Sequence, residues 1–300
     1  FNLTMKILIF GGNGFLGLQL AKKLSEIDHK VTIFDKNLKS IKSRKIKFIN
    51  GDILNKKRVD KAVAGQDIVF NFAAVSDIEE SIKNPLDTAK INIIGNINVA
   101  LACVKKKVKK LIFASTIYVH SSQGGFYKVS KKSSEMFLEE FFKRYKLKYT
   151  ILRFGTIYGK TSSEKNGLKK IIFSAFKYKK LEYSGTKKAQ RRYLHVNDAV
   201  DACIKIINKK YDKENILITG KKIIKVKKIL DIVSNKLNIK KKYFFKNIRG
   251  SGHYDTDPYT YKIPKEKKFF FKSQIDIEDG ISELINQFKK INNSWKNLNY

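Results

Sequence analysis

Cysteine, proline and long apolar runs are scarce in this 300-residue chain, which has two cysteines and three prolines. Two cysteines cannot build a disulfide framework or a cysteine-rich metal centre, and Cys103 and Cys203 lie in apolar helical patterns typical of small buried side chains. No apolar run reaches the roughly 18 residues of a membrane-spanning helix, and Met5–Phe10 is too short for the apolar region of a signal peptide, so we expect no targeting segment. We therefore expect a cytoplasmic protein that holds no metal.

Arginine is also scarce, because it supplies only seven of the 63 basic residues although the formal net charge is +36. A positive excess of this size is typical of proteins that bind nucleic acid or other polyanions. Base readout and bidentate phosphate recognition favour arginine, however, whereas the lysines here are scattered through every segment. We expect no specific nucleic-acid partner, and a polyanion-binding protein is the weakest of the three functions considered below.

The start of the chain predicts a strand, a glycine loop and a helix. Met5–Phe10 is a short apolar run, Phe15–Ile27 is amphipathic, and three glycines stand in the loop region. Gly11 permits a tight turn, Gly14 lets the backbone approach a pyrophosphate, and Gly17 lets the helix pack closely on the strand. A plain glycine turn is the alternative. The residues expected at the phosphates are Gly11, Asn13, Gly14, Phe15, Leu16 and Gly17.

An acidic residue follows the glycine loop at the distance that a dinucleotide site requires. Lys30–Phe34 predicts a second strand, and Asp35 follows it about twenty residues beyond the loop, where a carboxylate accepts both ribose hydroxyls of an adenosine. A 2′-phosphate would be repelled there, so the sequence predicts NAD rather than NADP, although Lys36 can soften this preference. The alternative for Asp35 is a solvated turn residue.

The repeated order of strands and helices that follows predicts a parallel, doubly wound sheet, with ligands beyond the carboxyl ends of its strands. After the third strand, Asp52 can accept a hydrogen bond from the adenine amine while Ile53 covers the ring. Alternatively, Asp52 caps a helix over Asn55–Ala64. After the fourth strand, Ala73 and Ala74 are small enough for the chain to pass close beside a cofactor.

Tyr127 and Lys131 form the candidate catalytic pair, because residues four apart share one face of a helix. A phenol with a pKa of about 10 is a poor base at neutral pH, and a nearby ammonium favours the phenolate. Thr116, at the end of the predicted strand Lys110–Ala114, could hydrogen-bond the same substrate oxygen while a hydride leaves for the nicotinamide. The alternative is an ordinary pair on a solvated helix face, which arises often in a lysine-rich chain.

Taken together, these motifs resemble the extended short-chain dehydrogenase/reductases of the nucleotide-sugar epimerase and dehydratase family. The first half of the chain carries the family's motifs in order: Gly11-x-x-Gly14-x-x-Gly17, Asp35, Asp52-Ile53, Phe72-Ala73-Ala74, Glu80-Ser81 with Pro85, Asn92-x-x-Gly95, Ser115-Thr116 and Tyr127-x-x-x-Lys131. The resemblance implies that Tyr127 is the acid/base, that Lys131 holds the cofactor ribose and that Thr116 orients the sugar hydroxyl. It adds further cofactor contacts at Phe72 and Asn92 and a substrate contact at Ser115.

The second half resembles the nucleotide-sugar lobe of the same family. Residues 191–198 resemble its Arg-Asp-Phe-Ile-Tyr-Val-x-Asp element, which implies that Arg191 contacts the nucleotide phosphates. Arg249 falls where a second phosphate-binding arginine is expected, and Thr156 stands where the family usually has a phosphate-contacting asparagine. Arg153 is either a further diphosphate ligand or half of a buried ion pair.

We therefore expect an α/β fold, a Rossmann-type doubly wound parallel sheet with a smaller, discontinuous C-terminal substrate lobe. Residues 5–160 are expected to form the NAD-binding domain with the catalytic triad. Residues 161–300 are expected to form mainly the substrate lobe, with segments around 190–220 returning to the first domain. Helices expected over Pro85–Lys105 and Tyr127–Tyr145 resemble the pair through which the family dimerises, which implies a homodimer.

The residues after Thr116 narrow the expected reaction. Family members that eliminate water carry Asp-Glu there, because β-elimination needs an extra acid and base, whereas this chain has Ile117-Tyr118. The resemblance therefore implies an NAD-dependent nucleotide-sugar 4-epimerase or 4-dehydrogenase/ketoreductase, similar to UDP-glucose 4-epimerases or GDP-heptose 4-dehydrogenases of polysaccharide biosynthesis. Its substrate would be a nucleotide diphosphosugar. The second hypothesis is a non-catalytic NAD-binding regulator on the same fold, which would not need the triad.

Overall fold

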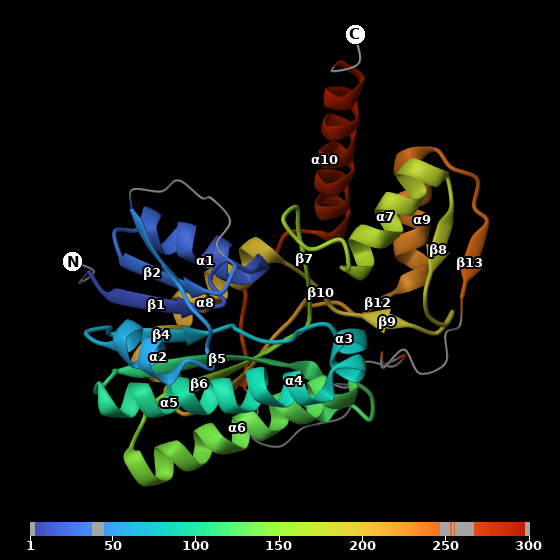
Figure 1. Ribbon diagram of the computed structural model, residues 1–300. Coiled ribbons are helices and arrows are strands. Elements are labelled where there is room, and N and C mark those ends of the chain that lie inside the picture. The colour runs from blue at the N-terminus through green and yellow to red at the C-terminus, as the bar shows by residue number, and fades with distance from the viewer. Residues whose placement is uncertain (1–3, 38–44, 247–252, 254, 256–266, 298–300) are drawn as a thin grey trace.

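The computed structural model describes residues 4–37, 45–246, 253, 255 and 267–297, and it is organised around one eight-stranded sheet (Figure 1). Every neighbouring pair of strands in this sheet is parallel, as the repeated strand and helix pattern predicted. The prediction of a Rossmann-type doubly wound sheet is confirmed. In spatial order the strands are β14 (Lys267–Lys268), β11 (Glu214–Ile218), β6 (Tyr149–Phe154), β5 (Lys110–Thr116), β4 (Ile68–Asn71), β1 (Lys6–Phe10), β2 (Lys30–Asp35) and β3 (Ile46–Asn50).

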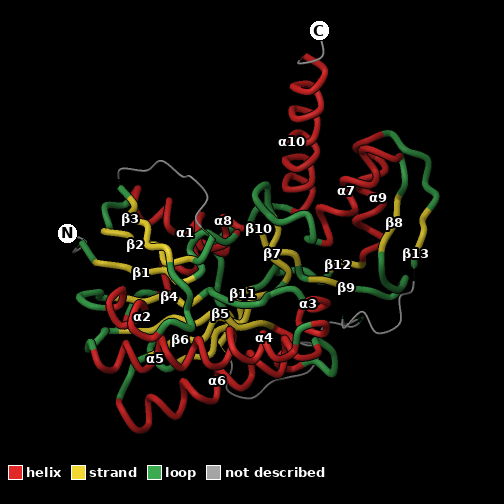
Figure 2. Tube along the Cα trace, viewed as in Figure 1, coloured by secondary structure: helices red, strands yellow, loops and turns green. Residues whose placement is uncertain are grey.

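Helices cover both faces of the sheet (Figure 2), which explains why the strands away from its two edges are apolar along almost their whole length. Successive side chains of a strand point to opposite faces. Ile7 and Ile9 of β1 therefore pack against α1 and α8, whereas Leu8 and Phe10 pack in the second core with α2, α5 and α6. The five helices are α1 (Phe15–Glu26), α8 (Val196–Ile206), α2 (Lys56–Val63), α5 (Gly95–Lys105) and α6 (Gly125–Tyr145).

The long helix predicted over Pro85–Lys105 has three parts: α4 (Pro85–Ala89), a π-helical turn over Lys90–Ile94, and α5. Single π-helical turns frequently accompany functional sites. Asn92 lies in this turn, is 2% exposed, and bonds both backbone groups of Val75. The Val75 N–H donates to Asn92 Oδ1 (2.8 Å), and Asn92 Nδ2 donates to the Val75 carbonyl (3.1 Å). The turn thereby holds the segment that follows β4.

A smaller lobe with its own apolar core lies beyond the carboxyl ends of the strands (Figure 1). Between the first and second of its helices the chain returns to the main domain, where α8 packs on α1 and β11 pairs with β6. The lobe contains α7 (Gly167–Tyr178), β8 (Leu181–Tyr183), α9 (Val226–Leu237), β13 (Tyr243–Phe245) and α10 (Ile277–Asn297), and two short strand pairs join it to the main domain: β7 (Thr156–Tyr158) with β10 (Tyr193–His195), and β9 (Gln190–Arg191) with β12 (Ile224–Lys225).

Within the described ranges, none of the helices is long and apolar enough to cross a bilayer. In the same part of the chain, no three His, Cys, Asp or Glu side chains are placed to share a metal ion. Cys103 and Cys203 are both buried and carry free thiols.

Candidate active site

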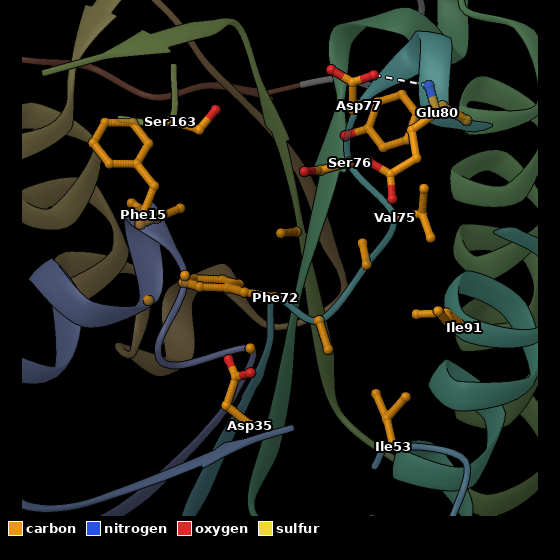
Figure 3. Close-up of a pocket in the computed structure, with 18 of the residues that line it drawn as sticks. Phe15, Asp35, Ile53, Phe72, Val75, Ser76, Asp77, Glu80, Ile91 and Ser163 are labelled. Carbon is orange, nitrogen blue, oxygen red and sulfur yellow. Dashed lines mark hydrogen bonds between the residues drawn. The ribbon is translucent and has the colours of Figure 1, made fainter. Parts of the chain in front are cut away.

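A cavity of about 910 Å³ lies at the carboxyl ends of the strands, between the sheet and the smaller lobe. Parallel α/β sheets bind ligands at this edge, where neighbouring connections pass to opposite faces. Figure 3 shows that Asp35 and Ile53 mark one end of the cavity, and that Asp77 and Ser163 mark the other. The cavity therefore has two ends: a cofactor end beside the glycine loop and a lobe end beside the smaller lobe.

The glycine loop passes so close to other backbone that side chains are excluded. Gly11 has φ +68°, and a Cβ there would lie 2.6 Å from the backbone nitrogen of Ala73. A Cβ on Gly17 would lie 2.5 Å from the carbonyl oxygen of Gly11. This close packing brings the start of α1 to the cavity, where Gly14 and Phe15 line it. No side chain caps the helix, so its first N–H groups suit an anionic ligand.

Asp35 lies at the end of β2 and lines the cavity as predicted. Its carboxylate accepts the backbone N–H groups of Asn13 and Asn37, both at 3.1 Å. An ionised carboxylate has about four acceptor positions, so two remain for a ligand's hydroxyl groups. Asn13 is not among the cavity-lining residues, its backbone N–H helps to hold Asp35, and its contact with the cofactor stays a prediction.

Asp52 and Ile53 line the same end of the cavity. The Asp52 carboxylate accepts the Leu54 N–H at 2.8 Å, which closes a turn. Asn55, not Asp52, caps α2 by accepting the N–H of Arg58. The alternative that made Asp52 the helix cap is therefore wrong, and its carboxylate stays at the cavity wall.

The segment after β4 forms the middle of the cavity wall. Phe72, Ala73 and Ala74 all line the cavity, and Figure 3 shows the Phe72 ring between the two ends. Asn92, which the family resemblance placed at the cofactor, is not among the lining residues. Its hydrogen bonds to Val75 make it a support for this wall.

Thr116, Tyr127 and Lys131 all line the cavity. Tyr127 and Lys131 occupy successive turns of α6, and the Lys131 amine lies 5.9 Å from the centre of the Tyr127 ring. Lys131 Nζ donates to the carbonyl of Ala114 at 2.8 Å and lies 4.8 Å from the centre of the Phe113 ring. The fold therefore brings the three predicted catalytic residues to one wall.

Burial dominates the protonation of these groups. It raises the pKa of the Tyr127 phenol to about 12, against a smaller lowering by the hydrogen bond with Thr116. It also lowers the pKa of the Lys131 amine to about 7, and Glu135 opposes that lowering. We had expected the ammonium to lower the phenol pKa. Instead, the buried phenol is protonated at neutral pH and is a proton donor in this state.

Sequence reasoning missed Glu135, which is fully buried one helical turn beyond Lys131. Arg153 Nε and Nη2 donate to its two carboxylate oxygens at 3.0 and 2.8 Å, and Ser115 Oγ donates to Glu135 Oε1 at 2.6 Å. Arg153 is thus half of a buried ion pair, the second of its two alternatives. Ser115 lines the cavity, but its hydroxyl proton is directed to Glu135. The sequence did offer a signal, because Glu135 is four residues after Lys131 and so lies on the same face of the predicted helix.

Of the three predicted substrate contacts in the second half, the two that the structure describes, Thr156 and Arg191, do not line the cavity. Thr156 begins β7, and only its neighbours Gly155 and Ile157 line it. Arg191 is 6% exposed and donates to the hydroxyl of Tyr183 at 2.8 Å. Arg249 lies outside the described residues. Contacts of Thr156, Arg191 and Arg249 with a substrate stay predictions.

The cavity end beside the smaller lobe has two facing polar segments (Figure 3). Asp77 caps the short helix α3 (Ile78–Lys83) by accepting the Glu80 N–H at 2.8 Å. From the opposite side, Lys165 Nζ donates to Glu80 Oε2 at 2.9 Å. Ser163 lies on the same side as Lys165. These segments are far apart in the sequence, so their meeting had no local signal.

This geometry agrees with a comparison of the sequence with known families. Residues 7–219 match the model of the NAD dependent epimerase/dehydratase family. The chain belongs to this family. Its cofactor is therefore NAD, in agreement with the prediction from the glycine loop and Asp35.

Relatives of this epimerase/dehydratase family member catalyse more than one reaction. The chain is 27% identical over 316 residues to a Methanocaldococcus jannaschii protein provisionally named UDP-glucose 4-epimerase, covering 95% of this chain and 99% of that protein. It is 26% identical over 364 residues to a Dictyostelium discoideum dTDP-D-glucose 4,6-dehydratase, covering 98% and 84%. Its fold matches the crystal structure of Thermotoga maritima UDP-glucose 4-epimerase with UDP-glucose, with a TM-score of 0.81, 24% identity, and coverage of 96% and 99%.

Proposed function

We propose that this chain is a nucleotide-sugar 4-epimerase or 4-dehydrogenase that transfers a hydride between sugar C4 and NAD. One observation carries the proposal: Thr116, Tyr127 and Lys131 lie on one wall of a cavity that also contains the glycine loop and Asp35. A substrate hydroxyl placed beside Thr116 and Tyr127 would lie close to the cofactor held by the loop. The named activities of two similar proteins, both acting on UDP-glucose at C4, support the same choice of substrate class.

Tyr127 moves the proton in this scheme. In oxidation, the C4–H bond breaks with departure of a hydride, and the proton of the C4 hydroxyl passes to the Tyr127 oxygen as the ketone forms. In reduction, the phenol returns a proton to that oxygen while a hydride reaches C4, from the other face if the product is the epimer. Thr116 holds the C4 oxygen. Bound NAD supplies the hydride acceptor and, when oxidised, a positive ring that favours the phenolate.

Lys131 has a separate task in the proposal, which is to bind the cofactor ribose. Its amine is 2% exposed and donates one of its hydrogens to Ala114. An ammonium has three donors, so two remain for the ribose hydroxyls. In its charged form the amine also favours the Tyr127 phenolate.

Elimination of water is not proposed, although a dehydratase is among the relatives. Ile117, which follows Thr116, is a core residue at 2% exposure, and the Tyr118 hydroxyl contacts His253 Nδ1 at 2.9 Å. Neither side chain has a carboxylate for the extra acid and base that β-elimination needs. Glu80, at the lobe end of the cavity, is paired with Lys165.

The first experiment identifies small molecules released by heating the purified protein, using mass spectrometry. NAD or NADH together with a nucleotide diphosphosugar is the expected result, and the sugar nucleotide then guides the assay. NADP alone would contradict the interpretation of Asp35. No nucleotide, together with no NADH binding on titration, would overturn the enzyme proposal.

The second experiment separates the reactions by following deuterium placed at C4 of UDP-, GDP- and dTDP-hexoses. A 4-epimerase returns the label to C4 of its product, whereas a 4-dehydrogenase leaves it on the reduced cofactor. A dehydratase would release a product lighter by one water. Binding of NADH without turnover of any sugar would favour the non-catalytic regulator.

We also propose that two copies pair through α4, α5 and α6, which lie side by side on one face (Figure 1). Apolar side chains are exposed there, including Leu86 at 65% and Met136 at 60%. A second copy with the same apolar surface would bury them. Light scattering after size-exclusion chromatography should give a dimer for the natural chain and a monomer for Met136→Glu. A monomeric natural chain would contradict the proposal.

A cytoplasmic setting is proposed from the cysteines. Cys103 and Cys203 are free and 0% exposed, and burial raises the pKa of both thiols. Buried thiols of this kind are structural and fit a reducing compartment. Fractionation of the source cells, with an antibody to this protein, tests the assignment.

A further inference from the structure

The end of β5 contacts three successive turns of α6. Residues of α6 spaced by four share one face, so all three contacts are on the side of the helix that faces the sheet. Two of these contacts involve Tyr127 and Lys131, which have roles in the proposed reaction. The third involves the Glu135 carboxylate, which has no role in that reaction. The contacting pairs are Thr116 with Tyr127, Ala114 with Lys131, and Ser115 with Glu135.

The carboxylate in the third contact is held rigidly. Glu135 is 0% exposed, and Arg153, at 4% exposure, binds both of its oxygens. Ser115 and Arg153 are register partners on the neighbouring strands β5 and β6, so Glu135 lies over the point where the two strands pair. Removing one partner of such a buried pair leaves the other charge uncompensated.

Lys131 has few charges around it. Its amine is bonded to the Ala114 carbonyl and lies near the uncharged Phe113 ring. The only carboxylate that acts on the Lys131 pKa among the described residues is Glu135, which raises it against the effect of burial. Four further groups lie close to Lys131 or interact with Glu135: Tyr127, whose ring centre is 5.9 Å from the Lys131 amine, Lys132 and Arg153, which pair with Glu135, and His120, whose pKa responds to Glu135.

Three of these groups contribute little variable charge. Tyr127 is neutral because its pKa is raised to about 12, and His120 is neutral because burial and Arg153 lower its pKa to about 4. The Lys132 amine lies 3.8 Å from Glu135 but its side chain is 46% exposed, so water screens its charge. Among the described residues, the charge that acts on Lys131 against burial is therefore that of Glu135, and Arg153 binds both oxygens of this carboxylate.

We propose that Glu135 and Arg153 are positioning residues that together set the charge of Lys131: Glu135 favours the protonated amine, and Arg153 limits this effect. The inference rests on the proposed role of Lys131 at the cofactor ribose. It predicts that removing Glu135 and removing Arg153 change the protonation of the Lys131 amine in opposite directions, because the two side chains have opposite charges. A clamp that only holds α6 against the sheet would instead be weakened in the same way by loss of either residue.

The test is the pH dependence of NADH affinity, measured on the full chain by fluorescence titration. If the ammonium binds the ribose, affinity of the natural chain falls as pH rises through the Lys131 titration. Lys131→Met should lack this fall. In Glu135→Gln the fall should begin at a pH lower by about one unit or more, and in Arg153→Met at a higher pH. The double variant Glu135→Gln/Arg153→Met has the same net charge as the natural chain. In this variant NADH affinity should fall at close to the same pH as in the natural chain.

Each outcome decides the matter. The inference is overturned if the pH at which NADH affinity falls is unchanged in the single variants, or if it moves in the same direction in both. The proposed role of Lys131 would then remain. A natural chain with the same profile as Lys131→Met overturns both the ribose role and the inference. Should a single variant fail to fold, the double variant still tests the idea, because a fall displaced by about one unit in it contradicts the charge balance.

Discussion

The cofactor end of the cavity and its catalytic wall are formed by different parts of the protein. At the cofactor end the protein presents mainly backbone: a glycine loop packed against Ala73, the uncapped start of α1, and Asp35 fixed by two N–H groups. At the catalytic wall it presents side chains, among them the buried Lys131, and the buried pair of Glu135 and Arg153 lies one helical turn beyond it.

This difference has consequences for what a substitution does. Backbone geometry is lost when a Cβ is added, and the loss affects binding and folding together. A buried side chain can be replaced by another of the same shape, so that chemistry is lost while binding is kept. Substitutions at the cofactor end should therefore reduce binding and stability, whereas substitutions at the catalytic wall should reduce turnover alone.

The largest expected effect is that of Tyr127→Phe, which should lower turnover by at least about 100-fold, because the ring stays while the proton-carrying oxygen is removed. NADH affinity and the melting temperature should stay unchanged. Tyr118→Phe is the matched control, since its hydroxyl contacts His253 and Tyr118 does not line the cavity. Turnover of Tyr127→Phe equal to that of the control would remove Tyr127 from the mechanism.

At the cofactor end, Gly11→Ala should weaken NADH binding at least about tenfold and lower the free energy of unfolding by about 1–3 kcal/mol. The reason is both the φ of +68° and the 2.6 Å approach to Ala73. Gly65→Ala is the control, because Gly65 has φ +72° with open space around its Cβ position. It should lose stability through strain alone and keep its NADH affinity. Equal NADH affinity in the two variants would contradict the importance of close packing.

Selectivity between cofactors should depend on one carboxylate. Asp35→Asn keeps an acceptor for the Asn13 N–H but removes the negative charge, so the preference for NAD over NADP should fall by about tenfold. Asp52→Asn is the control at the same end of the cavity and should leave that preference unchanged. Binding titrations with both cofactors measure the ratio, and equal changes in the two variants would speak against Asp35 as the selective residue.

The smallest expected effect is at the lobe end. Lys165→Met removes the bond to Glu80, but the Lys165 side chain is 59% exposed, so the KM for the nucleotide sugar should rise less than about fivefold. NADH affinity should not change. Glu80→Gln should give the same small rise, because it breaks the same contact. A large fall in kcat in either variant would show that this pair takes part in the chemistry.

Local patterns predicted the cofactor end well. The glycine loop, the strand before it and the acidic residue after the second strand lie within about thirty residues, so their spacing in sequence fixes their spacing in space. Asp35 and the glycines accordingly line the cavity. The amphipathic helix predicted over Phe15–Ile27 is found over Phe15–Glu26, because its apolar residues repeat at helical spacing.

Contacts between distant segments could not be predicted in this way. The π-helical turn depends on hydrogen bonds between Asn92 and Val75, which helical periodicity does not reveal. The hydrogen bond from Arg191 to the hydroxyl of Tyr183 on another strand is a second contact that neither periodicity nor the family resemblance revealed. In each case the partner is chosen by the tertiary fold, and a single sequence holds no record of that choice.

The return of α8 to the main domain affects the order in which the chain can fold during synthesis. Val200 and Cys203 of α8 belong to the core that covers Ile7 and Ile9 of β1. A ribosome makes the first six strands of the sheet and α1 well before it reaches α8, so the part of this apolar face that α8 covers stays open to water in the meantime. The growing chain therefore has a defined interval, ending when α8 leaves the exit tunnel, in which it needs protection from aggregation.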